Sequence, residues 1–195
     1  MTSGADTVSR RPKRADARRN YDLLIDAARK MFTAQSTEVP LEDIARNAGV
    51  GIGTLYRHFP SRQALLEGVY REEVEALCRS ADELADLPAD EALEIWLRRF
   101  VTYGQTKRAL ATELVNTLGR ESELFTACHV AIYSVADPLL KRAQQDGVIR
   151  KDVELSDVLR LVGGIAVNTA GVDDGQMAQR LLRVVLDGLR SHPAG

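Results

Sequence analysis

Apolar residues recur at intervals of three and four positions along most of the chain, which is the spacing of one face of an α-helix. No stretch alternates between apolar and polar residues for long enough to predict a β-sheet. Gly49, Pro60, Pro88 and Gly147 interrupt the pattern, and each marks a predicted helix end. The pattern therefore predicts an all-α protein with about nine helices, over residues 16–34, 41–48, 52–59, 61–87, 90–107, 109–118, 122–145, 156–170 and 175–189.

The two short helices within residues 41–59 are the most informative part of the chain. Gly49 stands where the first of them would end in a left-handed residue. In the second helix Leu55 and Phe59 lie four residues apart and are predicted to be buried. This arrangement turns outward a face that is small, hydroxylated and basic, made of Gly53, Thr54, Tyr56, Arg57 and His58. Such a face suits the major groove of DNA, which presents phosphate oxygens, base edges and thymine methyl groups.

This segment has two possible interpretations. It is either a helix-turn-helix that binds DNA, or a pair of short helices with a purely structural role. Many helical proteins contain two short helices joined by a glycine turn, so the topology alone is weak evidence. The outward side chains favour DNA binding, because an ordinary solvated face carries Glu and Lys more often than Thr, Tyr and His.

The charge of the chain is distributed unevenly. Residues 1–62 contain 11 Lys or Arg and 7 Asp or Glu, a formal charge of +4, whereas residues 63–195 contain 15 and 21, a charge of −6. This asymmetry favours a polyanion-binding N-terminal part. We expect a flexible basic arm at 1–15, a helix-turn-helix DNA-binding domain at 16–62, and a helical ligand-binding and dimerisation domain at 63–195. The arm either solubilises the protein or follows the DNA backbone or minor groove.

Residues 22–66 resemble the DNA-binding domain of the tetracycline-repressor (TetR) family of bacterial transcriptional regulators. The motifs that carry the resemblance are AARKMF at 27–32, IARNAGV at 44–50, GTLYRHF at 53–59, and then Ser61, Arg62 and Leu65. Beyond Leu66 only the number, length and order of the helices match. The resemblance implies a sequence-specific transcriptional regulator, with a ligand-responsive homodimeric repressor of a pseudo-palindromic operator favoured. Its partners would be double-stranded DNA, a second copy of the chain and a small-molecule effector.

The candidate DNA-binding residues are Ile52, Gly53, Thr54, Tyr56, Arg57, His58 and Arg62, taken from the second short helix and from the resemblance. Within this set the resemblance assigns DNA contact to Thr54 and Tyr56, and phosphate binding to His58 and Arg62. The sequence departs from the family where Val39 and Pro40 precede the first short helix, a place where Ser or Thr is frequent. Ile52 and Gly53 also offer no hydrogen bonds to bases. Sequence discrimination is therefore expected to depend on thymine-methyl contact, Tyr56 and DNA shape.

The C-terminal part is expected, by resemblance, to enclose a ligand and to form a dimer. Aromatic side chains at helical spacing suit a mostly apolar ligand, although the same stripes are ordinary core content. The candidate pocket residues are Trp96, Phe100, Tyr103, Phe125, His129 and Tyr133. The last two predicted helices carry more apolar surface than the remaining chain covers, which favours a four-helix bundle with a second copy over burial within one subunit. The candidate interface residues are Val158, Leu161, Val162, Ile165, Leu181, Val185 and Leu189.

Several other functions lack the residues that they require. No apolar run reaches the roughly 20 residues of a membrane-spanning helix, so a cytoplasmic protein without a membrane partner is predicted. Cys78 and Cys128 form no CxxC motif, and the three histidines, His58, His129 and His192, are scattered. We therefore expect no metal, no cofactor and no enzymatic activity. An effector-independent DNA-binding dimer or an activator remains as an alternative, and a helical enzyme or small-molecule carrier as a remote one.

Overall fold

The computed structural model describes residues 15–34, 39–119, 121–171 and 175–191. Residues 1–14 of the predicted basic arm lie outside the described residues, and so does His192. The described chain is helical, and its one β-type pairing is an isolated antiparallel bridge between Ile149 and Arg190. This confirms the all-α prediction. The helices are α1 (Ala15–Ala34), α2 (Leu41–Asn47), α3 (Ile52–His58), α4 (Arg62–Asp82), α5 (Ala89–Leu118), α6 (Glu123–Gln145), α7 (Leu155–Thr169) and α8 (Gln176–Leu189).

The contacts divide the described residues into two compact units. The first contains the described residues up to Glu72 together with those of Ala109–Ser122, and the second contains Glu73–Arg108 and the described residues from Glu123 onward. Both α4 and α5 continue from one unit into the other. The domain boundary expected after residue 62 falls at the first residue of α4, and the division into two functional domains there stays a prediction.

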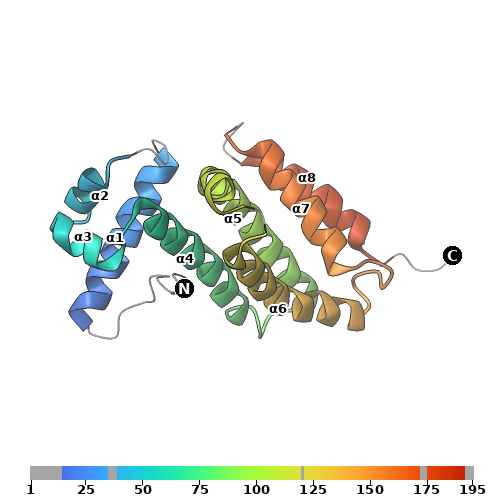
Figure 1. Ribbon diagram of the computed structural model, residues 1–195. Helices are drawn as coiled ribbons and strands as arrows, with labels where there is room; N and C mark the ends of the chain where they lie inside the picture. The colour runs from blue at the N-terminus through green and yellow to red at the C-terminus, as the bar shows by residue number, and fades with distance from the viewer. Residues whose placement is uncertain (1–14, 35–38, 120, 172–174, 192–195) are drawn as a thin grey trace, which may run out of the picture. The chain divides into compact units, whose positions relative to one another are not determined.

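In the first unit α1, α2 and α3 pack against one another (Figure 1). Their apolar faces meet in a small core that includes Leu24, Phe32, Ile44, Leu55 and Phe59, all of them buried. The predicted burial of Leu55 and Phe59 is therefore confirmed. Because these side chains lie on one side of each helix, the opposite side of α3 faces solvent.

In the second unit α7 and α8 lie side by side, and α6 packs against α7 (Figure 1). Helix α5 approaches α7 closely at Gly104, where an added Cβ would lie 2.7 Å from the Cβ of Ala166. One polar contact joins the same two helices, because the Nε2 group of Gln105 donates to the buried Thr169 Oγ1 at 2.9 Å. Thr169 Oγ1 in turn donates to the carbonyl of Ile165 at 2.8 Å, so this buried hydroxyl is satisfied.

Two helix boundaries differ from the sequence prediction. The segments 90–107 and 109–118 form the single helix α5, because no glycine or proline interrupts the backbone hydrogen bonds after Gly104. Helix α4 ends at Asp82 instead of residue 87, and the following residues form turns in which the Leu84 N–H donates to the carbonyl of Ala81 at 3.0 Å. At its other end α4 is capped by Ser61, whose Oγ accepts from the Ala64 N–H at 3.1 Å.

Candidate DNA-binding surface and effector site

The turn between α2 and α3 has the geometry that the sequence predicts. Gly49 adopts a left-handed conformation with φ of +69°. Its N–H donates to the carbonyl of Arg46 at 3.1 Å, and the Val50 N–H donates to the carbonyl of Ala45 at 3.0 Å. This pair of hydrogen bonds is a Schellman motif, which ends α2 and redirects the chain toward α3. A residue with a Cβ would be strained at Gly49.

Helix α3 presents most of the predicted DNA-binding residues to solvent. Ile52 is 38% exposed and Tyr56 is 45% exposed, and Gly53 and Arg57 are exposed as well. Thr54 and His58 are half-buried at the edges of this face. Below it Leu55 and Phe59 are completely buried. The structure therefore brings together six of the seven residues predicted to contact DNA, while their contact with DNA stays a prediction.

A residue of α1 that sequence analysis did not single out positions α3. The ring of Tyr21, which is buried, lies 5.1 Å from the ring of Phe59 and 6.3 Å from the ring of His58, both measured between centroids. Burial lowers the pKa of His58 below its ordinary value of 6.5. His58 is therefore mainly neutral at pH 7 and meets a partner as a hydrogen-bonding group.

Gly68 of α4 is a second positioning residue that the sequence did not reveal. A Cβ at this position would lie 2.8 Å from Cε1 of Phe59 and 3.2 Å from Cδ1 of Ile25. Glycine therefore lets α4 pack directly on the aromatic core below α3. The sequence around Gly68 does not reveal this role, because the side chains that a Cβ would meet belong to other elements.

Arg62, the seventh predicted DNA-binding residue, is engaged within the protein. Its guanidinium donates to the carbonyl of Val39, which precedes α2. This hydrogen bond accounts for a cation in the first turn of α4, where the helix dipole is unfavourable to it. Phosphate binding is thus not needed to explain Arg62.

The six candidate pocket residues lie on two helices of the second unit. On α5 the rings of Trp96 and Phe100 are stacked at 5.6 Å, and Phe100 lies 6.0 Å from Tyr103. Trp96 and Tyr103 are buried, so this group serves as core in the present structure. On α6 the rings of His129 and Tyr133 are stacked at 4.2 Å. Phe125, one turn before them, is half-buried.

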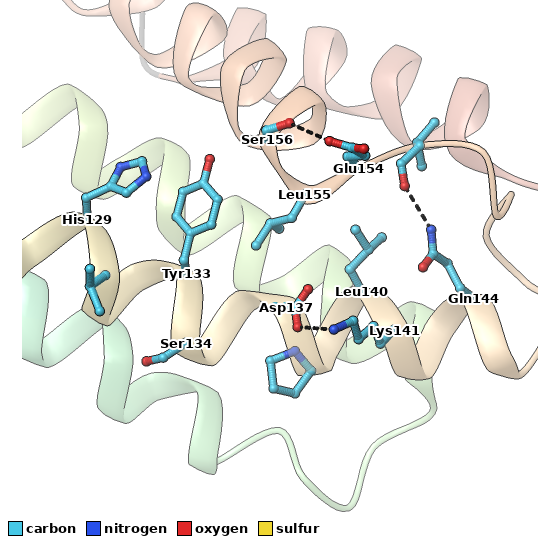
Figure 2. Close-up of a pocket in the computed structure, with 13 residues that line it drawn as sticks. His129, Tyr133, Ser134, Asp137, Leu140, Lys141, Gln144, Glu154, Leu155 and Ser156 are labelled. Carbon is cyan, nitrogen blue, oxygen red and sulfur yellow. Dashed lines mark hydrogen bonds and ion pairs between the residues drawn. The ribbon is translucent and has the colours of Figure 1, made fainter.

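His129 and Tyr133 line an open groove of about 800 Å³ along α6. Figure 2 shows both rings on the side of α6 that faces the start of α7, with Leu155 reaching from α7 toward them. Its other lining residues are Val130, Ser134, Asp137, Pro138, Leu140, Lys141, Gln144, Val153, Glu154 and Ser156. Lys141 pairs with Asp137 at 2.6 Å, whereas Trp96, Phe100, Tyr103 and Phe125 do not line this groove. It thus combines an aromatic wall with polar groups, as a small-molecule site requires.

The predicted dimer-interface residues separate into buried and exposed sets. Val158, Val162, Ile165 and Leu189 are buried within the subunit, so their apolar character is explained without a second copy. Leu161 is 56% exposed, Leu181 is exposed, and Val185 is half-buried. Two further apolar side chains are exposed on the same helices, Val167 on α7 and Val184 on α8, the latter at 68%. We call Leu161, Val167, Leu181 and Val184 the apolar face.

Two other kinds of site have no support among the described residues. There, no group of three or more His, Cys, Asp and Glu side chains is arranged to hold a metal ion. None of the helices α1–α8 combines the length and the apolarity that crossing a membrane requires.

The fold and the outward face of α3 define a class of protein, a helix-turn-helix protein with an additional helical body. The model of the tetR family of bacterial regulatory proteins matches residues 24–69, and that of the SbtR-like transcriptional regulator C-terminal domain matches residues 88–191. The chain therefore belongs to the TetR family, which is a family of bacterial regulatory proteins. This confirms the resemblance seen in the sequence.

Similar structures and relatives agree with this assignment. A TetR transcriptional regulator from Streptomyces coelicolor is 40% identical, with 88% of this chain and 98% of that chain covered and a TM-score of 0.77. A TetR regulatory protein from Mycobacterium vanbaalenii is 34% identical, with coverages of 92% and 99% and a TM-score of 0.70. The regulator EthR of Mycolicibacterium smegmatis is 30% identical over 125 residues, 56% of this chain and 55% of EthR. The chain thus spans about half the length of this curated relative, and 37% of a Staphylococcus aureus regulator that it also matches.

Proposed function

We propose that the chain is a homodimeric repressor that binds a pseudo-palindromic DNA operator and releases it when a small molecule occupies the helical body. The observation that carries the proposal is the outward face of α3, where exposed Tyr56 and Arg57 stand above the buried Leu55 and Phe59. In helix-turn-helix dimers the two recognition helices enter successive major grooves, about 34 Å apart. This regulator would act on DNA in the cytoplasm.

Base contacts and phosphate contacts have different consequences for binding, and this difference gives the test. Operator fragments are first selected from random duplex DNA with the full chain. Tyr56→Ala should then weaken binding to the selected operator by about 1 to 3 kcal/mol and reduce its preference over random DNA. Arg57→Gln should weaken binding to the operator and to random DNA alike. It should also make the slope of the logarithm of the binding constant against the logarithm of the salt concentration shallower by about one unit.

A matched control is Lys151→Gln, which removes one exposed positive charge from the second unit and should change neither property. If wild-type protein shows no preference for any duplex at moderate salt, the proposed function is wrong. If Tyr56→Ala keeps the full preference of the wild type, Tyr56 does not read the operator.

The apolar face supports the dimer. Leu181 and Val184 lie three residues apart on α8, and Leu161 and Val167 lie on the adjoining α7. Exposed aliphatic side chains gathered on two neighbouring helices are typical of a surface that another copy covers. Gly163 and Gly164 of α7 have open space at the Cβ position, which would allow a second backbone to come close.

We propose the α6 groove as the effector site. The stacked His129 and Tyr133 provide a flat aromatic wall, and Ser134 and Gln144 provide polar groups along its length. Effector binding would lower operator affinity by no more than its differential affinity for the two conformations. An effector-independent regulator with the same head would lack this linkage.

The effector proposal can be tested with the fluorescent apolar anion 1-anilinonaphthalene-8-sulfonate and a panel of metabolites. Compounds that displace the dye should also release the operator while the protein stays dimeric. Tyr133→Ala should weaken dye binding about tenfold, because one wall of the groove loses its aromatic ring. The control is Thr126→Ala, which changes an exposed residue of α6 outside the groove and should leave dye binding unaltered. Equal dye affinity in the Tyr133 and Thr126 variants would place the effector elsewhere.

A further inference from the structure

Ile52 is an exposed aliphatic side chain on the surface proposed to read DNA. It stands at the first residue of α3 with 38% of its surface exposed, and Tyr56 follows one helical turn later. Both neighbours of Ile52 are glycines, Gly51 and Gly53, so its side chain projects alone at this end of the face. An exposed branched aliphatic group here gains little from burial in the described chain.

The two glycines beside Ile52 are not required by the protein itself. A Cβ added at Gly51 or at Gly53 would meet no atom within 4 Å. Gly51 has φ of −69° and ψ of 146°, which any residue can adopt, and the φ of Gly53 lies outside the left-handed region. A glycine inside a helix is destabilising relative to alanine. Gly51 is the N-cap of α3, where glycine is common, so this cost applies to Gly53 alone. The bare backbone at Gly53 is therefore explained best by a surface outside the chain that approaches it closely.

The chemistry of the approaching surface follows from the residues around Ile52. Arg57 and His58 on the same short helix suit phosphates, which makes DNA the partner. The major groove offers one apolar group to an aliphatic side chain, the 5-methyl group of thymine. The absence of a side chain at Gly51 and Gly53 leaves room for the neighbouring base edges while Ile52 reaches the methyl group.

We propose that Ile52 is a specificity-determining residue that recognises the 5-methyl group of a thymine in each half of the operator. This assignment rests on the proposed DNA-binding function and adds the identity of one recognised base. It differs from recognition by hydrogen bonds, because an aliphatic side chain distinguishes thymine from deoxyuridine although both present the same hydrogen-bonding groups.

Replacing single thymines of the selected operator by deoxyuridine tests the proposal directly. For wild-type protein, one replacement in each half-site should weaken binding about 15-fold, as expected for the loss of two buried methyl contacts. Ile52→Ala should weaken binding to the thymine operator by a similar factor and should show no further loss at the same deoxyuridine position. Ile52→Val, which keeps a branched aliphatic group, should retain most of the discrimination.

Two further variants separate this contact from general effects. Leu23→Ala removes an equally exposed aliphatic side chain, 39% exposed, from α1 and should leave the thymine preference unchanged. Gly53→Ala should weaken operator binding while the thermal stability of the protein stays equal or increases, since the added Cβ has open space within the chain.

The proposal is overturned if Ile52→Ala discriminates between thymine and deoxyuridine as well as the wild type does, or if no single deoxyuridine weakens the wild-type complex. It is also overturned if Gly53→Ala binds the operator with undiminished affinity. A wild-type protein that prefers no duplex at all would instead refute the proposed function, so the two failures are distinguishable.

Discussion

At the scale of single residues, Lys107 is the most perturbed basic group in the described chain. Its Nζ lies 3.0 Å from the hydroxyl of Tyr103 and 4.3 Å from the centroid of the same ring. Burial lowers the pKa of Lys107 from its ordinary value of 10.5 to about 8, although the nearby Cys128 opposes this shift. The folded protein thus binds this proton less tightly than the unfolded chain does.

We predict that Lys107→Met stabilises the protein at pH 7. Below pH 8 the wild type carries the full cost of a charged, desolvated Lys107, and this cost disappears as the pH rises from about 8 toward 10.5, where both states become neutral. The gain should be on the order of 1 to 2 kcal/mol at pH 7, because water still screens a half-buried side chain. Urea unfolding at pH 7 and pH 9.5 would measure it.

Lys141→Met is the control for this measurement, since the Lys141 side chain is 63% exposed. Its effect on the free energy of unfolding should be small, because an exposed ion pair contributes little to stability. A Lys107→Met variant whose stability relative to wild type is independent of pH would contradict the assigned pKa shift.

At the scale of secondary-structure elements, the sequence predicts what local periodicity controls. The turn at Gly49 and the burial of Leu55 and Phe59 follow from spacing within one or two helical turns. The roles of Tyr21 and Gly68 could not be predicted, because both depend on contact with Phe59 at the end of a different helix. For the same reason, helical spacing alone could not predict which apolar residues of α7 are buried in the subunit and which are exposed.

The segment between α4 and α5 is held by a long-range contact of this kind. Arg142 on α6 donates from Nη1 to the carbonyl of Ala85 at 2.8 Å and from Nη2 to that of Leu87 at 3.1 Å. Nη2 also lies 3.4 Å from the carbonyl of Leu84. One guanidinium thus satisfies carbonyl groups that follow the end of α4, where a cation is also favoured by the helix dipole.

We predict that Arg142→Met lowers the free energy of unfolding by about 1.5 to 3 kcal/mol, because hydrogen bonds to a charged donor are lost from several carbonyls at once. Chemical denaturation at pH 7 measures the effect. The neighbouring Lys141→Met removes only a surface ion pair with Asp137, which should cost less than about 1 kcal/mol. Equal losses in the two variants would show that Arg142 does not hold the segment.

At the scale of the whole molecule, the proposed function depends on two copies acting together. A single helix-turn-helix contacts one half-site, whereas a dimer binds both halves of a twofold-symmetric operator and gains the effective concentration of the second head. The apolar face on α7 and α8 is the surface that would join the copies. Operator affinity should therefore be sensitive to substitutions that lie outside the helix-turn-helix.

Val184→Glu tests this dependence, because Val184 is the most exposed of the apolar-face residues at 68%. A charge buried between two copies loses its hydration without gaining a partner, so dimerisation should weaken about 100-fold or more. Analytical ultracentrifugation should show monomers that retain their helical circular dichroism, and operator binding should fall to the level of a half-site.

The control is Gln179→Glu, a substitution at an exposed position on α8 outside the apolar face. This variant should remain dimeric and bind the operator normally. A Val184→Glu protein that stays dimeric would exclude this face as the interface, and a monomeric variant with full operator affinity would show that DNA recognition does not need the dimer.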